Sequence, residues 1–333
     1  MRLPHRRRID RTFLALRAAR TIQYFEGRDE GGTPIESPFT MADMHAGVED
    51  CDALPSLVPM QTGERRPPFF CSHALFGVVS FLRHLAHHLG PEQPFYALRQ
   101  RGLDGVTAPH TRIETMAAYY VEQITKVQPH GPYLLGGFSF GGLVVYEMAQ
   151  QLHAQGRWVA LLAVIDTWFP NVAKPRFSPA PAAGLRRRIG FHVDNLLEAV
   201  RDFGPRGAGR YLASRLARKT HWFDIPPEPP EPPGPSTLPP RLRKLERLNT
   251  EATKAYTPLP YPGRITFLVR QRPEEVGNEV PRAPKMLALG GWEVRSVYSP
   301  YHFNLLYEPY VGDVAKKLKR CIDKALTTRA AAI

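Results

Sequence analysis

The first candidate for chemistry is Ser139, at the centre of the segment GGFSFGG at residues 136–142. With Gly137 and Gly141 it forms the pattern G-x-S-x-G, between an apolar strand-like run and a helix-like run. A sharp strand-to-helix turn would raise the serine hydroxyl above a sheet, and the helix N-terminus would offer N–H groups to an oxyanion. The pattern predicts a nucleophile, although a glycine-rich turn with an incidental serine fits the same letters.

A serine nucleophile needs an acid and a base, which follow such a motif in the order Ser, Asp or Glu, His. Asp166 ends the apolar segment VALLAVID, and His302 follows the strand-like segment WEVRSVYS. His302 is the one histidine after Asp166 that lies outside a basic insertion. Both residues fall at carboxyl ends of predicted strands, as Ser139 does, so the sequence predicts that the three side chains meet at one edge of a sheet.

Two backbone N–H groups are candidates for an oxyanion hole. Phe140 follows the predicted nucleophile directly at the start of a helix. The second donor is expected in the loop SHALFG after an earlier strand, where we select Leu75. A simple strand-to-helix connection without this role is the alternative.

Strand and helix patterns alternate along the chain. Strand-like segments lie at 67–73, 94–100, 133–138, 159–166, 263–271 and 292–299, and helical periodicity lies at 78–89, 111–124, 140–152 and 309–326. This alternation predicts the α/β class, with a mostly parallel sheet covered by helices on both faces. Thr111 and Glu114 are spaced as a capping box for the second helix.

The sequence divides into two regions, with an insertion in the second. Residues 1–55 show little periodicity and predict a loosely ordered basic extension, and residues 56–327 predict the α/β domain. An insertion at about 172–256 interrupts the alternation and predicts a helical lid over the site. Basic helices are expected there at about 184–202, 207–221 and 240–256, around the proline-rich run PPEPPEPPGPSTLPP.

Positive charge lies mostly outside the predicted catalytic region. The net charge is +13, and residues 1–20 and 182–247 carry +6 each. Such segments would attract an acidic partner, which could be a protein, a nucleic acid or a membrane surface, whereas a solvated face without a partner is the plain alternative. No nucleic-acid-binding motif supports the second of these partners.

Neither a membrane span nor a disulfide framework is predicted. No apolar run reaches the length of a spanning helix, so a cytosolic location without stable membrane insertion is expected. The arginine-rich start also resembles a transit peptide, but it contains no serine before residue 37. The three cysteines share no metal-ligand spacing, so we expect reduced thiols and no bound metal.

Several blocks in order carry a family resemblance. PPFFCSHALFG, LGPEQPFYALRQRGLDG, TRIETMAAYYVEQI, GPYLLGGFSFGGLVVYEMAQQL, LLAVIDT and YHFNLLYEPYV resemble segments of the thioesterase domains of polyketide synthases and nonribosomal peptide synthetases. The similarity runs from about Leu57 to Ala325. It implies an α/β-hydrolase fold, with nucleophile, acid and base at Ser139, Asp166 and His302.

The resemblance also implies a substrate and a partner. The substrate would be an acyl, polyketide or peptidyl chain on the 4′-phosphopantetheine arm of a carrier protein, with no cofactor bound to the enzyme itself. Hydrolysis of a seryl acyl-enzyme would release an acid, and attack by an internal nucleophile would give a ring, in secondary-metabolite biosynthesis. Carrier domains of this type are acidic, so the basic lid or N-terminal arm is expected to dock one.

Two departures and two alternatives remain. The family commonly has His-Pro-x-Gly-Gly where this chain has His73-Ala74-Leu75-Phe76-Gly77, and Asp or Asn where this chain has Tyr301. One alternative is an α/β-hydrolase acting on acyl-CoA or small free esters. The other is a non-catalytic binding protein with the same fold. The sequence indicates no oligomeric state.

Overall fold

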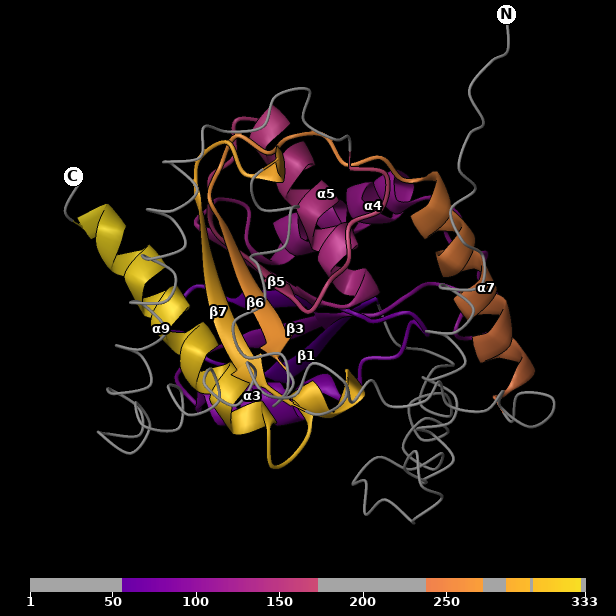
Figure 1. Cartoon of the computed structure of the whole chain (residues 1–333), viewed down its shortest axis with the longest axis horizontal. Helices are drawn as coiled ribbons and strands as arrows, with labels where there is room; N and C mark the ends of the chain where they lie inside the picture. The colour runs from indigo at the N-terminus through magenta and orange to yellow at the C-terminus, as the bar shows by residue number, and fades with distance from the viewer. Residues whose placement is uncertain (1–55, 173–237, 272–285, 300–301, 331–333) are drawn as a thin grey trace, which may run out of the picture.

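The fold is taken from a computed structural model, which describes residues 56–172, 238–271, 286–299 and 302–330. The predicted extension at 1–55 and the predicted helices at 184–202 and 207–221 lie outside these ranges, as does most of the proline-rich run. Figure 1 shows the described elements, coloured along the chain.

The described residues form a seven-stranded sheet whose strand order is β1-β3-β2-β4-β5-β6-β7. Only β1 runs antiparallel, paired with β3, and the other neighbours are parallel. The strands are β1 Leu57–Gln61, β2 Phe69–Ser72, β3 Phe95–Leu98, β4 Tyr133–Phe138, β5 Val159–Ile165, β6 Ile265–Gln271 and β7 Trp292–Tyr298. The predicted mostly parallel α/β sheet is confirmed.

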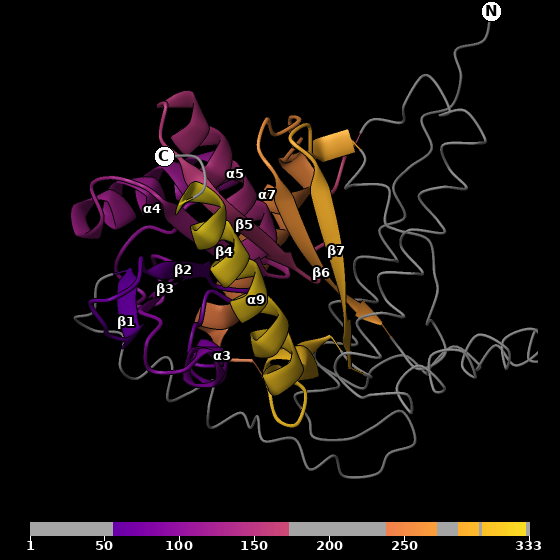
Figure 2. The ribbon, with the colours of Figure 1, turned by 90° about the vertical axis from the view of Figure 1, so that its left-hand side faces the viewer.

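Helices cover both faces of this sheet (Figures 1 and 2). The elements are α3 Leu82–Leu89, α4 Ile113–Val127, α5 Phe140–Ala154, α7 Pro240–Ala255, the 3-10 turn η2 Phe303–Leu306 and α9 Val311–Ala330. One core joins the sheet to α4 and α5, and a second joins its other face to α3 and α9. Adjacent strand residues alternate between them: Phe70 lies in the first core and Phe69 and Cys71 in the second.

Three local expectations were wrong. The strand β1 was not predicted; it lies at one edge of the sheet and pairs with β3. The first helix begins at Leu82 rather than near residue 78. The capping box does not form: Arg112 is the N-cap of α4 and no side chain caps the helix. Glu114 instead accepts hydrogen bonds from the guanidinium of Arg112, 3.1 Å for the shorter contact, because an extended Arg112 brings its side chain back over the first turn.

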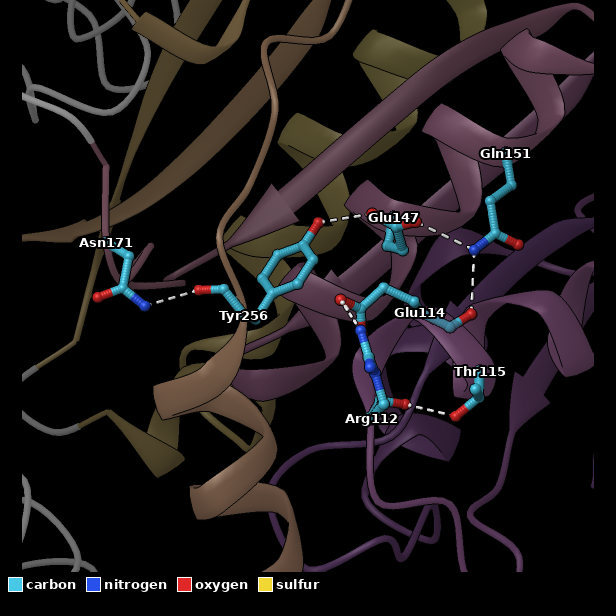
Figure 3. A network of polar contacts seen from close by, with 7 residues as sticks. All are labelled: Arg112, Glu114, Thr115, Glu147, Gln151, Asn171 and Tyr256. Atoms are coloured by element: carbon cyan, nitrogen blue, oxygen red, sulfur yellow. Dashed lines mark hydrogen bonds and ion pairs between the residues drawn. The ribbon is translucent and has the colours of Figure 1, made fainter.

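Both ends of the predicted insertion are tied together at the sheet. The Nδ2 of Asn171, just after β5, donates to the carbonyls of Lys254 and Tyr256 at the end of α7, at 3.0 and 2.8 Å. The Tyr256 hydroxyl donates to Glu147 of α5 at 2.9 Å, and Gln151 donates to the other oxygen of that carboxylate. Burial raises the pKa of the Tyr256 phenol, so this group remains a donor. Figure 3 shows the network, which fixes α7 against the body of the domain.

Candidate active site

Ser139 occupies a strained turn between β4 and α5. Its backbone has φ 56° and ψ −121°, a conformation that L-residues rarely adopt. The backbone N–H of Ser139 donates to Ile165 O at 2.9 Å, and its carbonyl accepts from the hydroxyl of Thr167 at 2.8 Å. These bonds to the end of β5 hold the turn in place, so the strain is balanced by contacts on both sides of the serine.

Glycine is required on both sides of this serine by close backbone contacts. A Cβ at Gly137 would lie 2.2 Å from the carbonyl oxygen of Gly141, within the same turn. A Cβ at Gly141 would lie 2.4 Å from the carbonyl oxygen of His73, in the loop after β2. The G-x-S-x-G spacing therefore lets the turn close tightly and brings the N-terminus of α5 against the loop that contains Leu75.

Asp166 and His302 are in direct contact. The Nδ1 of His302 lies 2.6 Å from Oδ2 of Asp166, and both side chains are half-buried. A carboxylate oxygen accepts, so Nδ1 carries the proton and Nε2 of the neutral imidazole is left with its lone pair. Asp166 itself has a positive φ of 42° and is held by its N–H, which donates to Leu268 O at 2.8 Å.

The imidazole lies against the segment that carries the serine. The ring of Phe138, the last residue of β4, stacks on the ring of His302 with centroids 4.6 Å apart and planes 25° apart. Phe138 directly precedes Ser139, and Asp166 directly follows β5, the strand paired with β4. Strands β4, β5 and β7 end at the same edge of the parallel sheet, so the three predicted residues share that edge.

Arg270 of β6 is a site residue that was not predicted. Its Nε lies 3.3 Å from Oδ2 of Asp166, the same oxygen that accepts from His302, and its side chain is 12% exposed. The carboxylate thus faces two donors, one of them permanently charged. The sequence signal was weak, because Arg270 lies in the strand-like run GRITFLVRQ among the many arginines of a basic chain.

The loop after β2 contains a buried histidine. His73 is fully buried, its ring stacks on Phe140 with centroids 5.7 Å apart, and its Nδ1 lies 2.7 Å from Ala74 O. Because a carbonyl only accepts, Nδ1 is the protonated nitrogen, and Nε2 finds no hydrogen-bond partner in the described part of the chain. Burial, with a small contribution from His110, lowers the pKa of His73 from 6.5 to about 4.

The peptide planes of this loop set the direction of the predicted donor. The carbonyl of Ala74 accepts from the His73 ring and from Gly77 N–H at 3.0 Å. In a trans peptide the N–H points opposite to the C=O, so the N–H of Leu75 points away from the His73 ring. Leu75 is half-buried, whereas Phe140 is buried at the first position of α5. Their roles as oxyanion donors remain a prediction.

Replacing His73 by phenylalanine should remove a pH-dependent loss of stability. Above pH 6.5 the imidazole is neutral in both states. As the pH falls toward 4, His73 takes up a proton in the unfolded chain but not in the folded chain. This uptake lowers the free energy of unfolding of the parent by about 3 kcal/mol. The His73→Phe variant lacks the imidazole and should not show this loss. Urea unfolding at pH 7, 5.5 and 4 measures this difference. The exposed His130→Gln variant is the control, and parallel curves for parent and His73→Phe would contradict the expectation.

Three further features of the described residues concern metal ions, membranes and thiols. Within residues 56–172, 238–271, 286–299 and 302–330, no cluster of three or more His, Cys, Asp or Glu side chains could hold a metal ion. Among the same residues, no helix is both long and apolar enough to cross a membrane. Cys71 and Cys321 are free thiols and are both buried, and burial raises the pKa of the Cys321 thiol to about 12.

The sheet and the turn around Ser139 define an α/β-hydrolase fold, and solved structures share it. The thioesterase domain of NocB from the nocardicin cluster aligns with a TM-score of 0.52 and 23% identity, covering 80% of this chain and 99% of that one. A four-domain nonribosomal peptide synthetase, AB3403 in its holo form, aligns with a TM-score of 0.53 and 21% identity over 80% of this chain and 20% of its own. At these identities the likeness establishes the fold.

Sequence comparisons match part of the chain to a protein family. Residues 67–205 match the thioesterase domain family. Malpibaldin synthetase of Mortierella alpina is 38% identical over 161 residues, and the dimodular nonribosomal peptide synthase of Bacillus subtilis (strain 168) is 37% identical over 179 residues. These matches cover 47% and 52% of this chain, and the chain spans only 3% and 7% of those relatives. The polyketide synthase PksR of B. subtilis (strain 168) is 38% identical over 121 residues, 36% of this chain and 5% of that protein.

Residues 67–205 therefore match the thioesterase domain family, and overlapping segments of the chain are similar to nonribosomal peptide synthetases and a polyketide synthase. This confirms the predicted family resemblance, and a family of thioesterases indicates a hydrolase. The departures noted in the loop 73–77 lie inside the matched segment, whereas Tyr301 lies outside both that segment and the described residues.

Proposed function

We propose that this protein releases an acyl, polyketide or peptidyl chain from the phosphopantetheine arm of a carrier protein, through an acyl-enzyme on Ser139. The observation that carries the proposal is the 2.6 Å contact between His302 Nδ1 and Asp166 Oδ2, at the sheet edge where Ser139 sits in its strained turn. The family match over residues 67–205 supports the same chemistry.

In the proposed first step the Ser139 oxygen attacks the thioester carbonyl carbon. His302 Nε2 takes the serine proton, and Asp166 stabilises the imidazolium that forms. The tetrahedral oxyanion is held by the N–H groups of Leu75 and Phe140. The carbon–sulfur bond then breaks, and the leaving thiolate receives the proton from His302. A thiol leaves readily because its pKa is about 8.5, so this step needs less acid assistance than amide cleavage.

The proposed second step is deacylation of Ser139. Water, or a hydroxyl or amine of the same chain, gives its proton to His302 Nε2 and attacks the ester carbonyl, and Ser139 recovers its proton as the carbon–oxygen bond breaks. Water yields a free acid, and an internal nucleophile yields a lactone or lactam. We propose that the insertion at about 172–256 acts as a lid that controls which nucleophile reaches the ester.

An acidic carrier is the proposed partner. The helix α7 at the end of the insertion exposes four basic side chains on its first two turns, namely Arg241, Arg243, Lys244 and Arg247. This surface suits the acidic face of a carrier, whose approach it would accelerate by electrostatic steering. The cytosolic location expected from the sequence stays a prediction.

Intact-protein mass spectrometry tests this function. After incubation with an acylated carrier, the protein should gain the mass of the acyl group, and peptide mapping should locate it on Ser139. Acyl transfer should slow as the ionic strength rises from about 50 to 300 mM with the carrier, but not with an uncharged acyl-N-acetylcysteamine thioester. A label on another residue, or no label together with no product, would refute the assignment. Faster transfer from acyl-CoA than from the carrier would refute the proposed partner.

A further inference from the structure

A buried amide pair joins α7 to the loop that carries Leu75. Asn249 of α7 is fully buried, and its Nδ2 donates to the carbonyl of Leu75 at 2.6 Å. The same amide exchanges two hydrogen bonds with the side chain of Gln100, at 2.7 and 2.8 Å. The orientation of the Asn249 amide is fixed, because a carbonyl oxygen at Leu75 can face only the nitrogen. Both hydrogens of Nδ2 are used, and Oδ1 accepts.

This pair completes the restraint of Leu75 from both sides. The peptide before Leu75 is held through Ala74 O, which accepts from His73 Nδ1 and from Gly77 N–H. The peptide after Leu75 is held through its own carbonyl, which accepts from Asn249. With both flanking peptide planes fixed, the φ and ψ of Leu75 are fixed as well, and so is the direction of its N–H.

The other end of the loop rests on the same glutamine. The backbone N–H of Gln100 donates to Gly77 O at 3.2 Å, and a Cβ at Gly77 would lie 2.6 Å from Gln100 Oε1. Gly77 has a φ of 81°, which favours glycine. The loop therefore packs directly on Gln100, and Gln100 is in turn paired with Asn249. No other described side chain donates to the carbonyl of Leu75.

We infer that Asn249 is a positioning residue that aims the oxyanion donor of Leu75. The inference rests on the proposed function, since it assigns a task to Leu75 in that reaction. Asn249 touches no reacting atom and acts through the loop backbone. A donor aimed in advance lowers the energy of the tetrahedral intermediate more than that of the bound thioester. Loss of the Asn249 side chain should therefore lower the rate of the chemical step and leave substrate binding unchanged.

The test compares Asn249→Leu with Leu245→Ala. Leucine has a similar volume to asparagine but cannot donate to Leu75 O. Leu245 is buried on the same helix, one turn before Asn249, and its side chain cannot form a hydrogen bond with Leu75 O, so Leu245→Ala reports the cost of disturbed packing. If Asn249→Leu does not fold, the same measurements are made on a second variant, Asn249→Ser. Rates are expressed per active site, counted by end-point labelling with a fluorophosphonate.

With an acyl-N-acetylcysteamine thioester, Asn249→Leu should lower kcat by about 10- to 100-fold with KM unchanged. Its affinity for an alkyl boronic acid, which forms a tetrahedral adduct on the serine, should fall by the same factor. Leu245→Ala should keep the parent kcat per active site. Parent values of kcat and boronate affinity in the folded Asn249 variant would overturn the inference, as would equal losses in both variants. If Ser139→Ala retained activity, the proposed function itself would fail, which is a separate result.

Discussion

Replacing Ser139 by alanine should lower kcat on the order of a millionfold, because Ser139, His302 and Asp166 act as one unit in the proposed reaction. The structure gives a reason to expect that activity is lost without any change in the fold. The backbone of Ser139 is held by Ile165 O and by the hydroxyl of Thr167, and neither contact involves the serine hydroxyl. Alanine should therefore leave the turn and the fold intact.

The measurement is single-turnover hydrolysis of an acyl-N-acetylcysteamine thioester, with thermal unfolding as the check on folding. Thr167→Val is a matched control, because it removes the hydroxyl that supports the turn and leaves the nucleophile in place. This control should lose much less activity than Ser139→Ala. A Ser139→Ala variant that retained parental turnover would exclude the seryl acyl-enzyme.

Replacing Asp166 by asparagine should lower kcat by about four orders of magnitude. Oδ2 of Asp166 accepts from both His302 Nδ1 and Arg270 Nε, at 2.6 and 3.3 Å. An amide oxygen in that position could keep both hydrogen bonds, but the negative charge would be lost. The positive charge of Arg270 would then oppose the imidazolium that His302 forms in the proposed reaction.

The double variant Asp166→Asn, Arg270→Gln separates the two effects. Removing the arginine charge should recover part of the activity that Asp166→Asn loses, since a cation no longer faces the charged imidazole. In the parent background, Arg270→Gln should cost much less than Asp166→Asn. Steady-state rates of the four proteins form a double-mutant cycle. A double variant that falls below Asp166→Asn would show that Arg270 supports the site by its contacts rather than by its charge.

The sheet and the shared edge of the site followed from local pattern. Ser139, Asp166 and His302 each come after a strand that the apolar runs predicted, and parallel strands that end together bring such residues to one edge. The edge strand β1 was missed because it contains Pro59, which a strand tolerates at the edge of a sheet. The capping box failed because a three-residue spacing does not specify which residue ends the extended segment, and here Arg112 does.

The support of the site depends on contacts that no local pattern reveals. Asn249 reaches Leu75 across 174 positions of sequence, and Arg270 reaches Asp166 across 104. Each of these residues lies in a segment whose pattern is already explained by a helix or a strand. Their side chains come into contact with the candidate site only when the sheet brings distant segments together, so the sequence predicted the candidate catalytic residues and not the residues that hold them.

The paired ends of the insertion limit how far a change in the length of residues 172–237 can disturb the sheet. Asn171 binds the carbonyls of Lys254 and Tyr256, so the chain leaves the domain after β5 beside the point where α7 ends. A chain that is closed at its base can change greatly in length at small entropic cost and without moving the sheet. Exchange of residues 172–237 alone, with α7 retained, should therefore leave both the sheet and the contact of Asn249 with Leu75 in place.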